Sequence, residues 1–204
     1  MVRIFIGAIA GGLVQFIIGA IAWATPLGRL AFKEANLAAT ADVQASMART
    51  LTPTGSGTYF IPSPETAEGT VMLGNGPVAL IHFNTNGFPP MDPVALLTGL
   101  VMSIVTMFLI GVALSLIDDY ARRVQALVLI GVATTLYFIF SLPVYNHYMP
   151  WAWWIYLGVE CLIAFVVGGF VMLKWFMPRL PVAHRAASES APPPESRSDA
   201  PPAL

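Results

Sequence analysis

Charged side chains are scarce in this sequence. Asp, Glu, Lys and Arg together make up only 10% of its 204 residues, while 56% of the residues are hydrophobic. Soluble domains average about 25% charged residues, and a water-soluble protein with so few would aggregate. The composition therefore predicts a membrane protein. The net charge of −1 also makes nucleic acid an unexpected partner.

Cysteine and histidine are almost absent as well. The single cysteine, Cys161, lies inside an apolar run, so it forms no internal disulfide and no CxxC pair. This argues against membrane oxidoreductases that pass electrons through paired cysteines. His82 and His147 lack the spacing of metal ligands, and no GxSxG, Walker or HExxH motif is present. We therefore expect no metal site, no cofactor and no catalytic residue.

What the sequence has in abundance is long apolar runs. A cleaved signal peptide is the competing interpretation of the first run, because "AWA" before Thr25 resembles a cleavage site. However, a signal core has about 7–15 residues, and this run has the roughly 20 residues that a bilayer needs. We favour an uncleaved helix. The predicted parts are transmembrane helices at 1–24, 92–117, 126–144 and 151–177, an extracytoplasmic cap at 25–91, a cytoplasmic loop at 118–125, an outer loop at 145–150, and a disordered cytoplasmic tail at 178–204.

The segment between the first two runs has patterns of its own. Residues 30–51 are rich in alanine with spaced charges and predict one or two helices. "TYFIP" at 58–62 and "VALIHF" at 78–83 are short, aromatic and β-branched, which is typical of strands. Asp92 and Pro93 suit the cap and first turn of the next helix. The predicted fold class is an all-α membrane protein, a four-transmembrane-helix bundle with a small α+β extracytoplasmic cap.

Basic residues near the runs predict the orientation. Cytoplasmic loops carry an excess of Lys and Arg. The connection at 145–150 has neither, which places it outside together with the cap, and both termini in the cytoplasm. Trp and Tyr at 151–156 then form an outer aromatic belt. The basic residues on the predicted inner side are Arg3, Arg122, Arg123, Lys174 and Arg179.

Glu160 is the residue most in need of explanation, because it lies near the middle of the last apolar run. At about 1.5 Å per residue, Gln15 lies roughly 16 Å from the inner end of its helix. Glu160 lies about 14 Å from the outer end of its own helix, so the two depths coincide in a core of about 30 Å. The sequence predicts a polar layer near this level. Its other members are Ser103, Thr106, Thr134 and Thr135.

Three roles for Glu160 remain open. Desolvation can keep a buried carboxyl group neutral, so that it simply donates a hydrogen bond between helices. An intramembrane carboxylate can instead carry a proton- or cation-linked function, or contact another membrane subunit. No second ionisable residue lies at its depth, which weakens a proton relay. Gly158, Gly168 and Gly169 lie on a different face of the run, so either this helix packs on two sides or Glu160 faces a partner or lipid.

Small residues mark the predicted helix-packing surfaces. Glycines recur on one face of the first run, together with Gln15. Such a stripe lets a second helix approach closely. The predicted helix-packing glycines are Gly7, Gly11, Gly19, Gly158, Gly168 and Gly169.

The chain resembles a group of uncharacterised bacterial inner-membrane proteins with four spans and an extracytoplasmic insert between the first two. The resemblance rests on the glycines of the first run, on "GTYFIP" at 57–62, on "GPVALIHF" at 76–83 and on the Trp-rich start of the last run. It implies a topology and a bacterial inner-membrane location, but no activity and no site residue. Our leading hypothesis is a structural or accessory protein that contacts the bilayer and a membrane-protein partner or a second copy. The alternative is a small transporter or ligand-binding protein using the layer around Glu160, and an enzyme ranks third.

Overall fold

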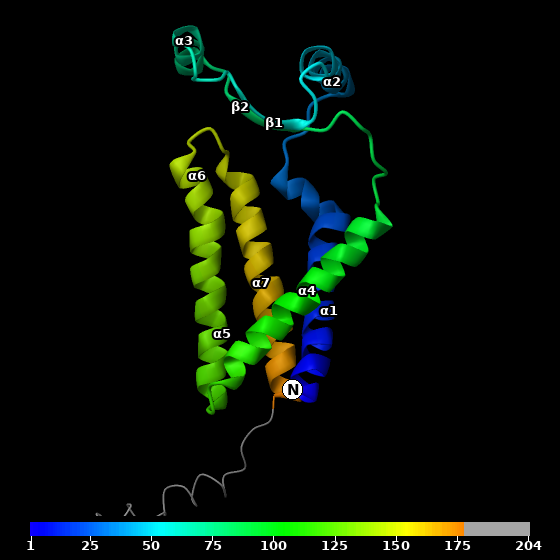
Figure 1. The fold of residues 1–204 in the computed structure, drawn as a ribbon, viewed down its shortest axis with the longest axis vertical. Helices are drawn as coiled ribbons and strands as arrows, with labels where there is room; N and C mark the ends of the chain where they lie inside the picture. Colours follow the sequence, from blue (N-terminus) through cyan, green and yellow to red (C-terminus); the bar gives the residue numbers. More distant parts are fainter. Residues whose placement is uncertain (178–204) are drawn as a thin grey trace, which may run out of the picture.

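A computed structural model describes residues 1–177. The tail at 178–204, predicted to be disordered, lies outside the described residues. The chain is mostly helical, with four helices long and apolar enough to cross a membrane and one two-stranded sheet (Figure 1). These features confirm the helical class and the small mixed insert. The four long helices are α1 (Val2–Ala24), α4 (Pro93–Ser115), the continuous stretch Tyr120–Tyr145, and α7 (Trp151–Phe176).

The pair α1 and α7 forms the centre of the bundle. The two helices run antiparallel and approach most closely at two glycines. A Cβ built on Gly11 would lie 2.6 Å from the carbonyl oxygen of Gly168, and the reverse distance is also 2.6 Å. Backbones can meet this closely only where side chains are missing. Consequently the Gly11–Gly168 contact sets the register of the pair.

The other two long helices pack against this pair. On α1, a Cβ at Gly12 would lie 2.6 Å from Cα of Ile104, so α4 packs here. On α7, a Cβ at Gly169 would lie 2.5 Å from the side chain of Leu127, which belongs to α5 (Tyr120–Thr134). Helix α4 also reaches α7, because a Cβ at Gly111 would meet the side chains of both Ile4 and Met172.

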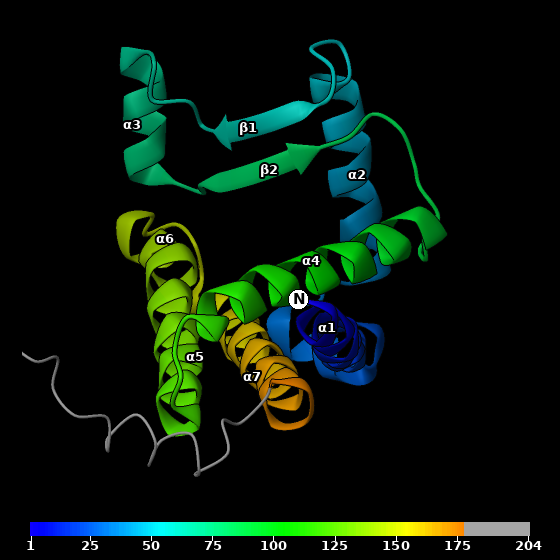
Figure 2. The same cartoon turned by 60° about the horizontal axis from the view of Figure 1, so that its bottom comes forward.

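The core lies at the end of the bundle that holds the N-terminus. We call this the tight end of the bundle. Helix α4 runs diagonally across α1 and α7, and its C-terminal end, which leads into α5, lies at the tight end (Figures 1 and 2). All buried residues of α4 lie in its second half. The buried cluster consists of Ile4, Leu114, Leu127, Leu173 and Met177.

The third long helix begins earlier than the apolar pattern predicts. We expected a loop at 118–125 and a helix from 126, whereas α5 starts at Tyr120. Asp119 caps it, its carboxylate accepting a hydrogen bond of 2.9 Å from the backbone nitrogen of Arg122. Arg123 is buried and donates from Nε to the carbonyl oxygen of Ile117. The first turn of α5 carries two arginines, so its low hydropathy predicted a loop. The Asp119 cap makes it helical instead. The stretch continues through a π-helical turn, Thr135–Phe140, into α6 (Ser141–Tyr145).

The insert between α1 and α4 crosses the other end of the bundle (Figures 1 and 2). Strands β1 (Gly57–Ile61) and β2 (Ala79–Phe83) pair antiparallel, with Tyr59 opposite Ile81. The sequence predicted both strands but not the helix between them, α3 (Ala67–Asn75). The remaining elements are a 3₁₀ helix, Pro26–Ala31, and α2 (Leu37–Leu51).

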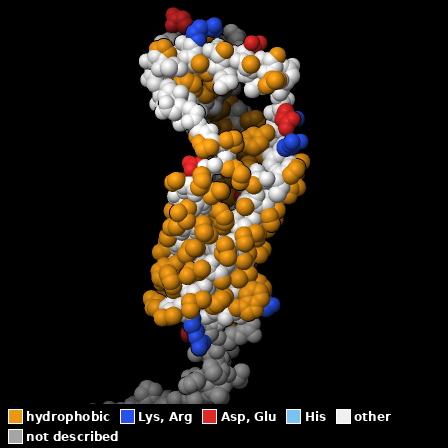
Figure 3. All heavy atoms as spheres, turned by 90° about the vertical axis from the view of Figure 1, so that its right-hand side faces the viewer, with side chains coloured by type: hydrophobic (Ala, Val, Ile, Leu, Met, Phe, Trp, Pro, Cys, Tyr) orange, Lys and Arg blue, Asp and Glu red, His pale blue; other side chains and the backbone are white. Residues whose placement is uncertain are grey.

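The insert, which we call the cap, makes only a small contact with the bundle. The rings of Phe60 in β1 and Tyr148 in the loop before α7 meet edge to face at 4.8 Å. Helix α2, by contrast, buries none of its residues. On the face shown in Figure 3, hydrophobic side chains cover the bundle, whereas most charged ones lie on the cap and near the two ends of the bundle. This band of apolar surface is what four membrane-crossing helices would present to lipid.

Candidate functional site

Glu160 turns from α7 toward α1, and it meets the last turns of that helix. Its Oε2 accepts hydrogen bonds of 3.4 Å from the indole Nε1 of Trp23 and of 3.4 Å from Sγ of Cys161. A Cβ on Gly19 would lie 3.4 Å from Oε1. The bond from Trp23 is longer than the usual range of about 2.7–3.2 Å for N–H···O, and the thiol of Cys161 is a weak donor. Because a carboxylate offers about four acceptor positions, this group has unused capacity.

Tyr156, one turn before Glu160, is hydrogen-bonded to a backbone carbonyl of α1 that has no partner within its own helix. The carbonyl of Ala22 would normally accept from the backbone nitrogen four residues later, but that residue is Pro26, which has no N–H. The Tyr156 hydroxyl donates to this carbonyl at 2.6 Å instead. The tyrosine ring also meets the ring of Trp23 edge to face at 5.1 Å. The end of α1 and the outer part of α7 are thereby joined.

We expect Tyr156→Phe to lower the free energy of unfolding by about 1 kcal/mol, because it leaves the Ala22 carbonyl without a donor. The thermal midpoint of the purified protein in mild detergent measures this. Tyr145→Phe is the matched control, since Tyr145 is exposed and no hydrogen bond of its hydroxyl is found within residues 1–177. Equal midpoints for the two variants would contradict the assignment.

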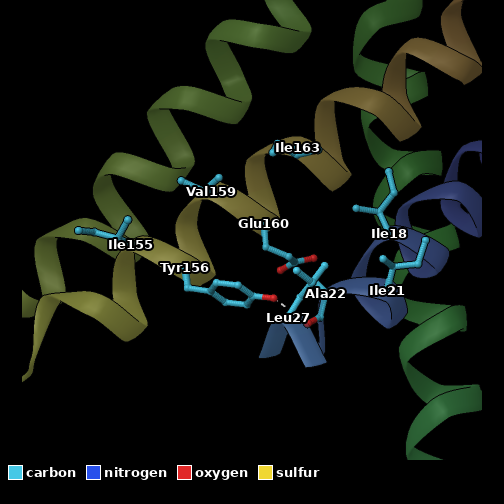
Figure 4. A pocket seen from close by; sticks show the side chains of 9 residues that line it. All are labelled: Ile18, Ile21, Ala22, Leu27, Ile155, Tyr156, Val159, Glu160 and Ile163. Carbon is cyan, nitrogen blue, oxygen red and sulfur yellow. Dashed lines mark hydrogen bonds between the residues drawn. The ribbon is translucent and has the colours of Figure 1, made fainter. Parts of the chain in front are cut away.

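A groove lies beside these residues, between α7 and the cap end of α1. It has a volume of about 380 Å³. Figure 4 shows the Glu160 carboxylate and the Tyr156 ring reaching from α7 toward Ala22 and Leu27, with aliphatic side chains on both sides. Glu160 is the only ionisable carboxylate among the lining residues. The aliphatic side chains that line the groove are Ile18, Ile21, Ala22, Leu27, Ile155, Val159 and Ile163.

Gln15, the partner that we expected for Glu160, lies elsewhere. Its Cβ would be 3.2 Å from a Cβ on Gly168, two turns along α7 from Glu160. Its Oε1 is buried and has no hydrogen-bond partner within residues 1–177. Gln15 therefore packs between the Gly11–Gly168 contact and the level of Glu160, and it makes no hydrogen bond to the carboxylate. A similar depth along two helices does not bring two side chains into contact, because it leaves the rotation of the helices undetermined.

The hydroxyl groups of the expected polar layer do not reach Glu160 either. Ser103 donates to the carbonyl of Gly99 at 3.0 Å, one turn back in its own helix. Thr134 is exposed and donates to Ile130 at 2.8 Å in the same way. Thr135 is buried and Thr106 is partly buried, and neither bonds to Glu160. Such bonds to the preceding turn satisfy a hydroxyl without any partner helix.

Helix α7 packs on two sides, which was one of the two alternatives that the glycine positions left open. Gly168 meets Gly11 of α1, whereas a Cβ on Gly158 would meet the ring of Phe140 and one on Gly169 would meet Leu127. Gly7 packs in turn against the side chains of Met172 and Phe176 in α7. The six predicted packing glycines are thus divided between two interfaces, and Gly19 lies beside the Glu160 carboxylate.

Sequence reasoning missed Trp23 as a neighbour of Glu160. Tyr156 lies one turn from Glu160 on the same helix face, but it was assigned only to the outer aromatic belt. The available signal was Pro26, whose missing N–H frees a carbonyl near the end of α1. Within residues 1–177, no group of three or more His, Cys, Asp or Glu side chains could hold a metal ion.

The comparisons with known proteins gave no match: no protein-family model, curated protein or solved structure resembles this chain significantly.

Proposed function

We propose that the chain is a multi-pass protein of the bacterial inner membrane. Four long apolar helices support insertion into a bilayer. The arginines at positions 3, 122 and 123 and Lys174 gather at the tight end of the bundle, which the positive-inside rule assigns to the cytoplasm. The cap is then extracytoplasmic. The resemblance to bacterial four-span proteins with an insert after the first helix supports the same arrangement.

Its proposed role is that of a non-enzymatic accessory protein whose cap contacts another protein. The observation that carries this proposal is helix α2, which has 15 residues and buries none of them. A helix of this length is marginal in water without tertiary packing. Val43 near its centre is 57% exposed, and Leu37 at its start is 85% exposed. A partner surface would supply the missing packing.

We expect a photo-crosslinking amino acid at position 43 to give an adduct of discrete mass in intact membranes, because α2 is the proposed contact. The same amino acid at Asn86, an exposed polar position in the loop before α4, is the control and should give little. Gel mobility and mass spectrometry identify the adduct as a second copy or as another protein. If position 43 crosslinks no more than position 86, and the protein purifies as a monomer without partners, the accessory role is wrong.

A second role, ligand binding or transport, is favoured by the groove that contains Glu160. No hydrogen bond joins Gln15 or Thr134 to Glu160, so this role rests on the groove alone. The accessible lining of the groove is almost entirely apolar, and Glu160 is the one acidic residue among the lining residues. That combination of apolar walls with a few polar groups is typical of small-molecule sites.

A further inference from the structure

The groove beside Glu160 is open at the side of the bundle. Ile21 of α1 and Ile155, Val159 and Ile163 of α7 form its rim, and each is about half exposed, from 49% to 52%. In the proposed membrane orientation these residues face lipid tails in the outer half of the bilayer. A molecule dissolved in that leaflet would therefore reach the groove without crossing water.

The carboxylate of Glu160 lacks a counterion. Glu160 takes no part in the exposed Arg29–Glu34 ion pair at 3.9 Å, and no Lys or Arg lies among the residues that line the groove. Its two hydrogen bonds are a long one from the Trp23 indole and one from the Cys161 thiol, a weak donor. An ionised carboxylate in an apolar setting is costly unless it is paired. A positive charge beside Glu160 would supply the missing partner, while the rest of the lining is apolar.

One aromatic ring, that of Tyr156, lines the groove beside Glu160. It meets the ring of Trp23, which lies outside the lining, at 5.1 Å between ring centroids. The face of a Tyr ring attracts cations, and the attraction is stronger away from water. A small metal ion would not suit this site, because it requires several oxygen ligands and only one carboxylate is present.

We propose that this groove binds a hydrophobic organic cation, with its apolar body between α1 and α7 and its positive charge beside Glu160. This inference rests on the second proposed role and gives it a ligand class. It does not depend on the accessory role of the cap.

The test is equilibrium dialysis of the purified full-length protein in mild detergent with radiolabelled tetraphenylphosphonium, after subtraction of binding to empty micelles. Triphenylphosphine oxide is the neutral probe of similar shape, and tetraphenylborate is the anion of the same shape. We expect the cation to bind at least tenfold more tightly than the neutral probe, and the anion not to bind above micelles.

Glu160→Gln should weaken cation binding at least tenfold, because it removes the charge while keeping an acceptor for Trp23. Glu65→Gln, in the exposed loop before α3, is the matched control and should bind as the parent protein does. Ile163→Trp provides a second variant, which should weaken binding by filling the groove without altering the carboxylate. Size-exclusion chromatography checks that each variant is folded.

Two results would overturn the inference in different ways. Equal binding of the cation and the neutral probe, or unchanged cation binding by Glu160→Gln, would overturn the cation class and leave ligand binding standing. Binding of neither probe above empty micelles would overturn the ligand-binding role together with the inference. The photo-crosslinking experiment at position 43 tests the accessory role separately.

Discussion

Gly168→Val is expected to separate α7 from α1 and to destabilise the bundle by about 3 kcal/mol or more. The valine Cβ alone would lie 2.6 Å from the carbonyl oxygen of Gly11, and backbone cannot rotate away as a flexible side chain can. The helices must therefore move apart. This movement would also break the hydrogen bonds from Trp23 to Glu160 and from Tyr156 to Ala22, because both depend on the register of the same pair.

Intrinsic helix propensity cannot explain such a loss, since valine is a better helix former than glycine. Gly99→Val is the matched control, because Gly99 also lies in a long apolar helix and a Cβ there would only touch the Phe16 ring at 3.7 Å. Thermal unfolding in mild detergent, followed by near-ultraviolet circular dichroism, measures both variants. A similar fall in midpoint for the two would show that the Gly11–Gly168 contact does not hold the bundle together.

Leu127→Ala is expected to destabilise the protein by about 2–3 kcal/mol, at the lower end of the range for buried leucines. Leu127 is 0% exposed and covers Gly169, so its removal leaves a cavity between α5 and α7. The cost should come from lost packing, because burial from lipid gains little hydrophobic free energy. A soluble protein would lose the transfer term as well.

The control for this variant is Leu129→Ala, two residues along the same helix, where the side chain is 59% exposed. It removes the same atoms from the lipid-facing surface and should leave the thermal midpoint almost unchanged. Comparable losses from the two variants would indicate that α5 contributes to the fold by its hydrophobicity alone. That result would contradict the packing of Leu127 on Gly169.

Local patterns in the sequence predicted the elements well. Apolar runs of bilayer length predicted four long helices, and the part of the chain that the structure describes has four. Asp92 caps α4 with a hydrogen bond of 2.9 Å to the backbone nitrogen of Val94, as its place before Pro93 predicted. The two short β-branched segments became paired strands. The apolar runs, the cap and the strand propensities are local properties of the chain, so they required no knowledge of distant contacts. The pairing of the two strands is not local, since it places Tyr59 opposite Ile81.

The surroundings of Glu160 could not be obtained in the same way. Sequence alone determined that one carboxylate lies in the middle of the last apolar helix, and roughly at what height. A helical rise converts residue numbers into depth, but it does not say how two helices slide or rotate against each other. The contact between Gly11 and Gly168 decided that register, and the missing N–H of Pro26 gave Tyr156 its partner. Only the tertiary structure therefore brought Glu160 to Trp23 and to an open groove rather than to Gln15.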